Sequence, residues 1–119
     1  MGNPGLHHKL NYIEFTTSSI ERTKEFYSKV FAWTFKDWGP DYIDCKPECS
    51  GIAIGFARGE AKAAAGAPLA VLYSADLKAT EAAILAAGGS IVVPVFEFPG
   101  GRRFHFSDQA GNVMGVWSE

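Results

Sequence analysis

The chain lacks any apolar run long enough to cross a membrane. A helix that spans a bilayer takes about 20 consecutive apolar residues, and no stretch of this sequence approaches that length. Residues 1–8 also lack the apolar segment of a secretory signal. These absences argue against a membrane partner and against export, and they predict a cytoplasmic location.

Positive charge is scarce as well. The sequence carries 11 basic and 13 acidic residues, and it has no basic cluster beyond the adjacent Arg102 and Arg103. Nucleic-acid-binding domains concentrate Lys and Arg on one face, so no nucleic-acid partner is predicted. We interpret the two arginines as part of a solvated strand or turn.

Cysteine and histidine are few, with two and three residues respectively. Cys45 and Cys49 have a Cys-x3-Cys spacing, but a structural zinc site needs about four ligands and no second Cys or His pair lies nearby. His7 and His8 are adjacent, so on an extended segment they point to opposite sides. We therefore expect no zinc site, and two ordinary buried, reduced thiols.

What the chain does have is the size and apolar content of one domain, with 119 residues of which 47% are hydrophobic. Its first half has the pattern βαβββ. Residues 10–16 are rich in strand formers, and the hydroxyls of residues 17–19 can cap an amphipathic helix that runs to about Ala32. Three short strands are predicted after the helix, at residues 33–38, 41–46 and 51–58.

The second half repeats this order after a predicted linker at residues 59–68. Residues 69–74 predict a strand, Asp76 caps a helix, and Gly88 and Gly89 end it. An offset of 58 residues places Asp76 beside Ser18. Three further strands are predicted at residues 90–95, 102–107 and 113–117.

A single βαβββ unit is too small to bury both its helix and its sheet well. We therefore predict an α+β fold in which two units join in one curved mixed sheet, with the helices outside. The concave face of that sheet would be a natural ligand cavity.

The segment 106–117 is the most informative stretch. Residues 108–112 have the composition of a tight polar turn in which Gly111 is free to take positive φ. The apolar runs on either side predict two antiparallel strands.

Four short motifs stand out along the chain, at residues 21–27 with 30–33, 86–89, 99–104 and 108–112. In this order and spacing they resemble the vicinal oxygen chelate superfamily, which contains glyoxalase I, extradiol dioxygenases, fosfomycin-resistance enzymes and bleomycin-binding proteins. The resemblance covers about residues 9–118 and implies paired βαβββ modules, at about 9–58 and 69–118 of one domain. It also suggests a homodimer.

Metal-using relatives hold a divalent cation with side chains from the first and last strands of each module. The resemblance places these positions at Tyr12, at Leu69 or its neighbour, and at Gly115, while the strand at 51–56 has no donor side chain in any register. None of these residues is a usual ligand. We therefore predict that the family's metal site is absent and that no cofactor is used.

Strand alternation nominates residues for the concave face. Tyr12, Tyr73 and Trp117 could stack on a flat or apolar ligand, although plain core filling is an equally good interpretation of each. Glu14 could accept hydrogen bonds or act as a base, but it could also be an ordinary solvated strand residue. His105 could be a general acid or base near neutral pH, or simply half exposed on its strand.

Three hypotheses for function follow. The favoured one is a metal-independent protein that binds a small, partly aromatic or apolar molecule in the concave cavity, similar to the bleomycin-resistance branch. The alternative is a lyase, isomerase or dioxygenase-like enzyme that uses acid or base residues in place of the metal. The third is a structural or regulatory module whose cavity is closed by its own aromatic side chains.

Overall fold

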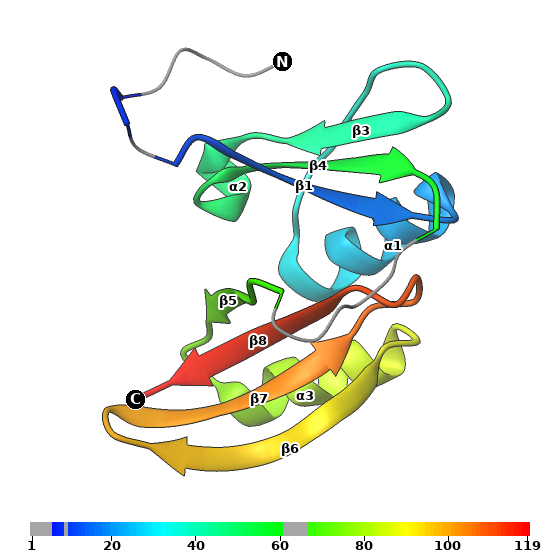
Figure 1. Ribbon diagram of the computed structural model, residues 1–119. Helices are drawn as coiled ribbons and strands as arrows, with labels where there is room; N and C mark the ends of the chain where they lie inside the picture. Colours follow the sequence, from blue (N-terminus) through cyan, green and yellow to red (C-terminus); the bar gives the residue numbers. More distant parts are fainter. Residues whose placement is uncertain (1–5, 9, 61–66) are drawn as a thin grey trace. The chain divides into compact units, whose positions relative to one another are not determined.

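The computed structural model describes residues 6–8, 10–60 and 67–119 (Figure 1). The chain divides into two compact units, Met1–Ala61 (unit 1) and Lys62–Glu119 (unit 2). Both combine a four-stranded mixed sheet with helix, which confirms the α+β class and the two βαβββ modules. The predicted joining of the two sheets in one curved surface stays a prediction.

Unit 1 has the strand order β1-β4-β3-β2. Strand β1 runs parallel to β4, and the other neighbours are antiparallel. The elements are β1 (Tyr12–Thr17), α1 (Ile20–Phe31), β2 (Lys36–Asp37), β3 (Tyr42–Cys45), α2 (Pro47–Ser50) and β4 (Ala53–Arg58).

Unit 2 has the equivalent order β5-β8-β7-β6, again with one parallel pair, β5 with β8. The antiparallel pair β6 and β7 contains register shifts around Pro94, where the strand bulges. The elements are β5 (Ala70–Tyr73), α3 (Leu77–Ala86), β6 (Ser90–Phe98), β7 (Gly101–Ser107) and β8 (Val113–Ser118).

Two expectations for local structure in unit 1 are wrong. The strand predicted at residues 33–38 shrinks to two residues, because Trp33 is buried and stacks on Tyr27 with ring centroids 5.1 Å apart. The segment after β3, interpreted as a break, forms the short helix α2, since Pro47 suits the first turn of a helix. Trp33 is therefore part of the core.

Helix α1 packs on its sheet through an aromatic core. Tyr27 is fully buried and contacts Phe56 of β4 at a centroid distance of 5.1 Å. Burial of large aromatic side chains contributes roughly 1.5–3 kcal/mol each. Side chains that alternate with Phe56 and with Ile43 of β3 therefore face away from the helix.

The same hydroxyl device begins the helix in both units. In unit 1, Thr23 Oγ1 donates to Thr17 Oγ1 at 2.7 Å, and Thr17 Oγ1 also accepts from the backbone N–H of Ser19. In unit 2, Ser74 and Thr80 repeat the hydroxyl pair at 2.7 Å. The spacing of six residues within each pair is identical, which supports a duplicated module.

The helix caps in the structure correct the predicted alignment of the two halves of the chain. Ser19, not Ser18, is the N-cap of α1, and its side chain accepts from the N–H of Arg22. Asp76 caps α3 as predicted, by accepting from the N–H of Ala79. The offset between the caps is thus 57 residues rather than 58, because two adjacent serines offered equivalent caps in the sequence.

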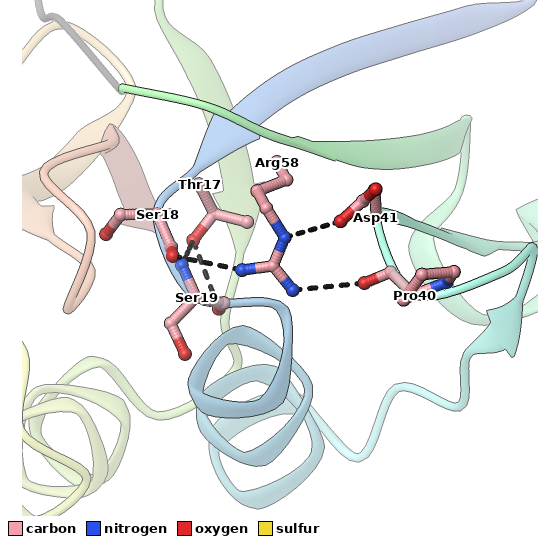
Figure 2. A network of polar contacts seen from close by, with 6 residues as sticks. All are labelled: Thr17, Ser18, Ser19, Pro40, Asp41 and Arg58. Carbon is pink, nitrogen blue, oxygen red and sulfur yellow. Dashed lines mark hydrogen bonds and ion pairs between the residues drawn. The ribbon is translucent and has the colours of Figure 1, made fainter.

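The guanidinium of Arg58 forms hydrogen bonds at one end of the unit 1 sheet (Figure 2). Arg58, the last residue of β4, donates from Nε to Asp41 at 2.6 Å and from its terminal nitrogens to the carbonyls of Pro40 and Ser18, at 3.1 and 3.4 Å. These contacts join the β2–β3 loop to the start of α1. The groups are largely exposed, so we expect a modest contribution to stability.

The polar turn between β7 and β8 forms as predicted. Asp108 is buried, and its Oδ1 accepts from the backbone N–H groups of Ala110 and Asn112, both at 2.9 Å. Gly111 has φ 95°, which the absence of a Cβ allows. Among the described residues, no helix is both long and apolar enough to span a bilayer.

Candidate functional site

A glycine occupies the same place in the last strand of both units. Glu14 of β1 pairs with Gly55 of β4, and Val71 of β5 pairs with Gly115 of β8. Both glycines are buried and lie on the sheet face that points away from the helix of their own unit. The two faces differ in what occupies the space that a Cβ would have filled.

In unit 1 this space holds two phenol groups. A Cβ at Gly55 would overlap the hydroxyls of Tyr12 and Tyr42. The two hydroxyls share a hydrogen bond of 2.5 Å, and Tyr42 donates to Glu14 Oε1 at 3.0 Å. We call these four residues, together with the buried Asp44, the tyrosine face.

Neither phenol of the tyrosine face is a ready base. Burial raises the pKa of Tyr12 above its ordinary value, and the carboxylates of Asp44 and Glu14 raise it further. Burial also raises the pKa of Tyr42 far above the usual range, helped by its hydrogen bonds with Tyr12 and Glu14. Both hydroxyls stay protonated near neutral pH, so they can orient a ligand but do not abstract protons.

In unit 2 the space beside the glycine holds an imidazole and aliphatic groups. A Cβ at Gly115 would lie 3.4 Å from His105 Cδ2 and equally far from side-chain atoms of Leu69 and Val71. His105 is the strand neighbour of Gly115, as Arg103 is of Trp117. We call the set that shares this side of the sheet the arginine face: Val71, Tyr73, Phe96, Phe98, Arg103, His105, Gly115 and Trp117.

Aromatic rings surround the guanidinium of Arg103. Its Cζ lies 5.1 Å from the ring centre of Phe96 and 5.5 Å from that of Phe98, within the range of cation–π attraction. Trp117 meets Phe98 and Tyr73 edge to face, at 6.3 and 5.1 Å. The rings hold the cation beside an apolar hollow of about 220 Å³, lined by Val71, Phe98, Arg103 and Trp117.

Two polar atoms of the arginine face lack a hydrogen bond. Arg103 Nε and His105 Nε2 are buried and have no partner among the described residues. A buried unpaired polar atom costs about 1–3 kcal/mol, so a ligand that hydrogen-bonded either atom would recover part of this cost. Burial, and then the charge of Arg103, lowers the pKa of His105 below its ordinary value, so the imidazole is neutral at pH 7.

The predicted site residues fall on these two faces. Tyr12 and Glu14 meet through Tyr42, while Tyr73, His105 and Trp117 share the arginine face. Whether any of them binds a ligand stays a prediction. Leu10, which strand alternation would place on the same side as Tyr12, precedes β1 and is 81% exposed.

Sequence reasoning missed several residues of these faces. The interpretation of Arg103 as solvated is wrong, since its side chain is half buried among rings, whereas Arg102 is exposed. Phe96 and Phe98 were missed because the strand was predicted to end at Val95, whereas β6 bulges near Pro94 and continues to Phe98. The alternation of Arg103 and His105 with buried phenylalanines was the available signal.

The metal positions of the resembled superfamily do not fit a cation here. Gly55 and Gly115 have no side chain, and phenol and imidazole groups occupy the space in front of them. In the part of the chain that the structure describes, no three His, Cys, Asp or Glu side chains are grouped so as to hold a metal ion.

Paired βαβββ units define the class of vicinal oxygen chelate proteins. The family model described as Glyoxalase/Bleomycin resistance protein/Dioxygenase superfamily matches residues 9–116. Because this match spans most of the chain, the protein belongs to that superfamily. No curated protein sequence matches the chain as a relative.

Solved structures agree on the fold. A glyoxalase/bleomycin resistance protein/dioxygenase family enzyme from Burkholderia phytofirmans PsJN is 17% identical, with a TM-score of 0.76 over 92% of this chain and 98% of that one. The fosfomycin resistance protein FosX from Mesorhizobium loti is 15% identical, with a TM-score of 0.76 over 96% and 94% of the two chains.

A variant of FosX from Listeria monocytogenes is 15% identical, with a TM-score of 0.78 over 94% of this chain and 90% of that one. Its structure contains Mn(II) and 1S,2S-dihydroxypropylphosphonic acid. At such low identity the likeness shows the fold alone. Membership in the superfamily supports ligand binding or an enzyme activity of this family, without deciding between them.

Proposed function

We propose that the protein binds a small, partly aromatic or apolar molecule on the arginine face of unit 2, without a metal ion. The observation that carries this proposal is the combination of an apolar hollow with two buried, unpaired polar atoms, Arg103 Nε and His105 Nε2. Binding sites for small molecules are typically apolar concavities with a few placed polar groups.

The chemistry of the hollow favours an anionic ligand. Trp117 and Phe98 offer ring edges and faces to a flat molecule, and Arg103 supplies a permanent positive charge beside them. A carboxylate or phosphonate accepts charge-assisted hydrogen bonds from a guanidinium. The proposed ligand is therefore a small acid whose body is aromatic or apolar.

Metal independence rests on the glycine positions. A carboxylate side chain at Gly115 would have to enter space beside His105, Leu69 and Val71, and one at Gly55 would displace the paired tyrosines. Tyr12 and Glu14 are also predicted ligand contacts, but both already interact with Tyr42. A ligand would have to exchange these hydrogen bonds, so we assign the tyrosine face the weaker role.

A thermal-shift screen tests the proposal. The panel contains benzoate, phenylphosphonate and related small acids, together with uncharged amide analogues, each with and without Mn²⁺ or Zn²⁺. A ligand at ten times its Kd stabilises the native state by roughly 1.4 kcal/mol, which raises the Tm by several degrees. We expect shifts from acids, smaller shifts from amides, and no requirement for metal.

Matched variants locate the binding. Arg103→Met keeps much of the side-chain length and removes the charge, while Arg102→Met changes the exposed neighbour on the opposite side of the strand. Affinity for an acid should fall about 10- to 100-fold in the first variant, because hydrogen bonds to charged groups contribute about 1.5–3 kcal/mol. Equal loss in both variants, or binding that requires a metal, would contradict the proposal.

The alternative is an enzyme that uses an acid or base in place of a metal. It is favoured by His105, whose neutral imidazole has a buried Nε2 without a partner and could accept a proton from a bound substrate. This alternative predicts turnover of a ligand found in the screen, and loss of that turnover in His105→Gln with binding retained. Binding without turnover favours the first function.

The resemblance and the sequence also lead us to propose a homodimer in the cytoplasm. Sedimentation equilibrium of the purified chain measures the first point, and fractionation of cells that express it measures the second. A monomer at micromolar concentration would argue against the dimer.

A further inference from the structure

The only two cysteines of the chain lie together at the end of β3. Cys45 is the last residue of that strand and is buried, whereas Cys49 lies in α2 and is exposed. The expectation of two ordinary buried thiols is thus wrong for Cys49. The Cys45 thiol donates to the backbone carbonyl of Lys46 at 3.8 Å, and the backbone N–H of Cys49 donates to the same carbonyl at 2.9 Å, so the two cysteines lie beside one oxygen atom.

Cys49 also opens into a pocket. It lines a hollow of about 280 Å³ together with Thr34 and the lysines Lys36 and Lys46. The hydroxyl of Thr34 lies 3.4 Å from Cys49 Sγ. Asp44 and Glu48 also line the hollow, so it carries both signs of charge. A reagent that enters this hollow meets the sulfur of Cys49 directly.

The two thiols differ in acidity. Hydrogen bonding from Thr34 lowers the pKa of Cys49, with a further contribution from the Cys45 thiol and against the opposing charge of Glu48. Burial raises the pKa of Cys45 to about 11. Near neutral pH, Cys49 is therefore the thiol that supplies the nucleophilic thiolate, while Cys45 keeps its proton.

We propose that Cys49 and Cys45 form a redox site in which Cys49 reacts with a hydroperoxide and Cys45 resolves the product as an intramolecular disulfide. Cys49 Sγ attacks one oxygen of the hydroperoxide, so that an S–O bond forms and the O–O bond breaks. The released alkoxide or hydroxide takes a proton from water. Cys49 is then a sulfenic acid, oxidised by two electrons.

The second step uses the neighbouring thiol. Cys45 Sγ attacks the sulfur of the sulfenic acid, an S–S bond forms, the S–O bond breaks, and the hydroxyl leaves as water with the proton of Cys45. In sum, two thiols and one hydroperoxide give a disulfide, an alcohol and water. The site lies in unit 1, so it is independent of the ligand proposed for unit 2.

Hydrogen peroxide treatment of the full-length protein tests this site, with free N-acetylcysteine oxidised in parallel as the reference thiol. Wild type should lose both free thiols and the mass of two hydrogens, without forming disulfide-linked dimers. Cys45→Ser should accumulate a sulfenic acid at Cys49 that dimedone traps. In Cys49→Ser, Cys45 should stay unreactive toward both peroxide and maleimide.

Thr34→Val distinguishes a tuned thiol from a merely exposed one. Removal of one hydrogen bond should slow the reaction of Cys49 about 3- to 10-fold, whereas the neighbouring exposed substitution Lys36→Met tests the contribution of charge. Circular dichroism checks that each variant is folded, and Cys45→Ala replaces Cys45→Ser if the buried hydroxyl prevents folding.

Three results would overturn the proposal. The first is retention of both thiols in wild type under conditions that oxidise N-acetylcysteine. The second is a disulfide that links two chains through Cys49 in place of the intramolecular one. The third is a Cys45→Ser or Cys45→Ala protein, shown to be folded, that dimedone does not label.

Discussion

In unit 1 the residue opposite Glu14 is Gly55, and in unit 2 the residue opposite Val71 is Gly115. The equivalent strand order and a hydroxyl pair at the start of the helix recur in both units. The surroundings of the two glycines differ. In front of Gly55, the hydroxyl of Tyr42 is hydrogen-bonded to Tyr12 and to Glu14. Beside Gly115, Arg103 Nε and His105 Nε2 have no hydrogen-bond partner within the described part of the chain.

The difference shows how a duplicated module can be specialised by few side chains. Hydrogen-bonded tyrosines fill the tyrosine face, and the hydrogen bond with Tyr12 helps burial to raise the pKa of Tyr42. On the arginine face, the ring of Phe96 lies against the guanidinium of Arg103. This contact leaves Arg103 Nε without a hydrogen bond to any residue that the structure describes. The polar groups of the tyrosine face are therefore hydrogen-bonded to one another, whereas the arginine face still has polar atoms that could bind a ligand.

The largest expected effect is a difference in unfolding free energy between alanine substitutions at the two glycines. Gly55→Ala would place a methyl group against the hydroxyls of Tyr12 and Tyr42, so we expect it to cost about 2–3 kcal/mol, as overpacked sites do. Gly115→Ala has ordinary contacts at 3.4 Å and should cost less than about 1 kcal/mol. Urea denaturation measures both.

A double variant serves as the control for this prediction. Tyr42→Leu removes one of the two hydroxyls that the new methyl group would meet, so it should cost less in the Gly55→Ala background than in wild type. If the two glycine variants lost the same stability, the contrast between the faces would be wrong.

The hydroxyl pairs offer a second comparison. The pair of Thr17 and Thr23 is buried, while that of Ser74 and Thr80 is only partly buried. Thr23→Val should therefore cost about 1–2 kcal/mol and Thr80→Val about 0.5 kcal/mol, since an unpaired hydroxyl is penalised more when water cannot reach it. Thermal unfolding of the two variants in parallel measures the difference, and a reversed order would show that burial does not set the cost.

A smaller effect is expected from loss of the hydrogen bonds of Arg58, the last residue of β4. Arg58→Gln removes the contacts with Asp41, Pro40 and Ser18 and should cost about 0.5–1 kcal/mol, less at high salt, because the groups are exposed. Unit 2 has Ser118 at the end of its last strand, so Ser118→Ala should show no such salt dependence. Urea midpoints at low and high salt compare the two.

The smallest effects are expected at opposite ends of the pH scale. The lowered pKa of His105 means that the unfolded chain binds the proton first, so stability falls as the pH drops below about 6.5. The raised pKa values of Tyr12 and Tyr42 mean that stability falls as the pH rises above about 10.

Two variants separate these contributions. His105→Gln should reduce the loss of stability at acid pH and leave the loss at alkaline pH unchanged. Tyr42→Phe should reduce the loss at alkaline pH and leave the loss at acid pH unchanged. Urea midpoints from pH 5 to pH 11 provide the measurement. An acid loss that is identical in wild type and His105→Gln would show that the imidazole is not the group that titrates.

Much of the fold could be predicted from local signals. The helix over α1 followed from its amphipathic spacing, and the turn at residues 108–112 followed from Asp108 and Gly111, both of which act as expected. The length of β6 could not be predicted, because Pro94 stops a regular strand but is tolerated at a bulge. The helix α2 was missed since four residues give no periodicity.

By itself, the sequence determined where α3 and the turn at residues 108–112 begin and that both last strands lack a donor side chain at the glycine positions, because caps, turns and residue identity act over a few neighbours. Only the tertiary structure decided what fills those positions. Tyr42 reaches Gly55 across the sheet, Arg103 lies against rings of β6, and Cys49 lies beside Thr34. Such contacts depend on strand register and on a bulge, which side-chain packing over the whole unit sets.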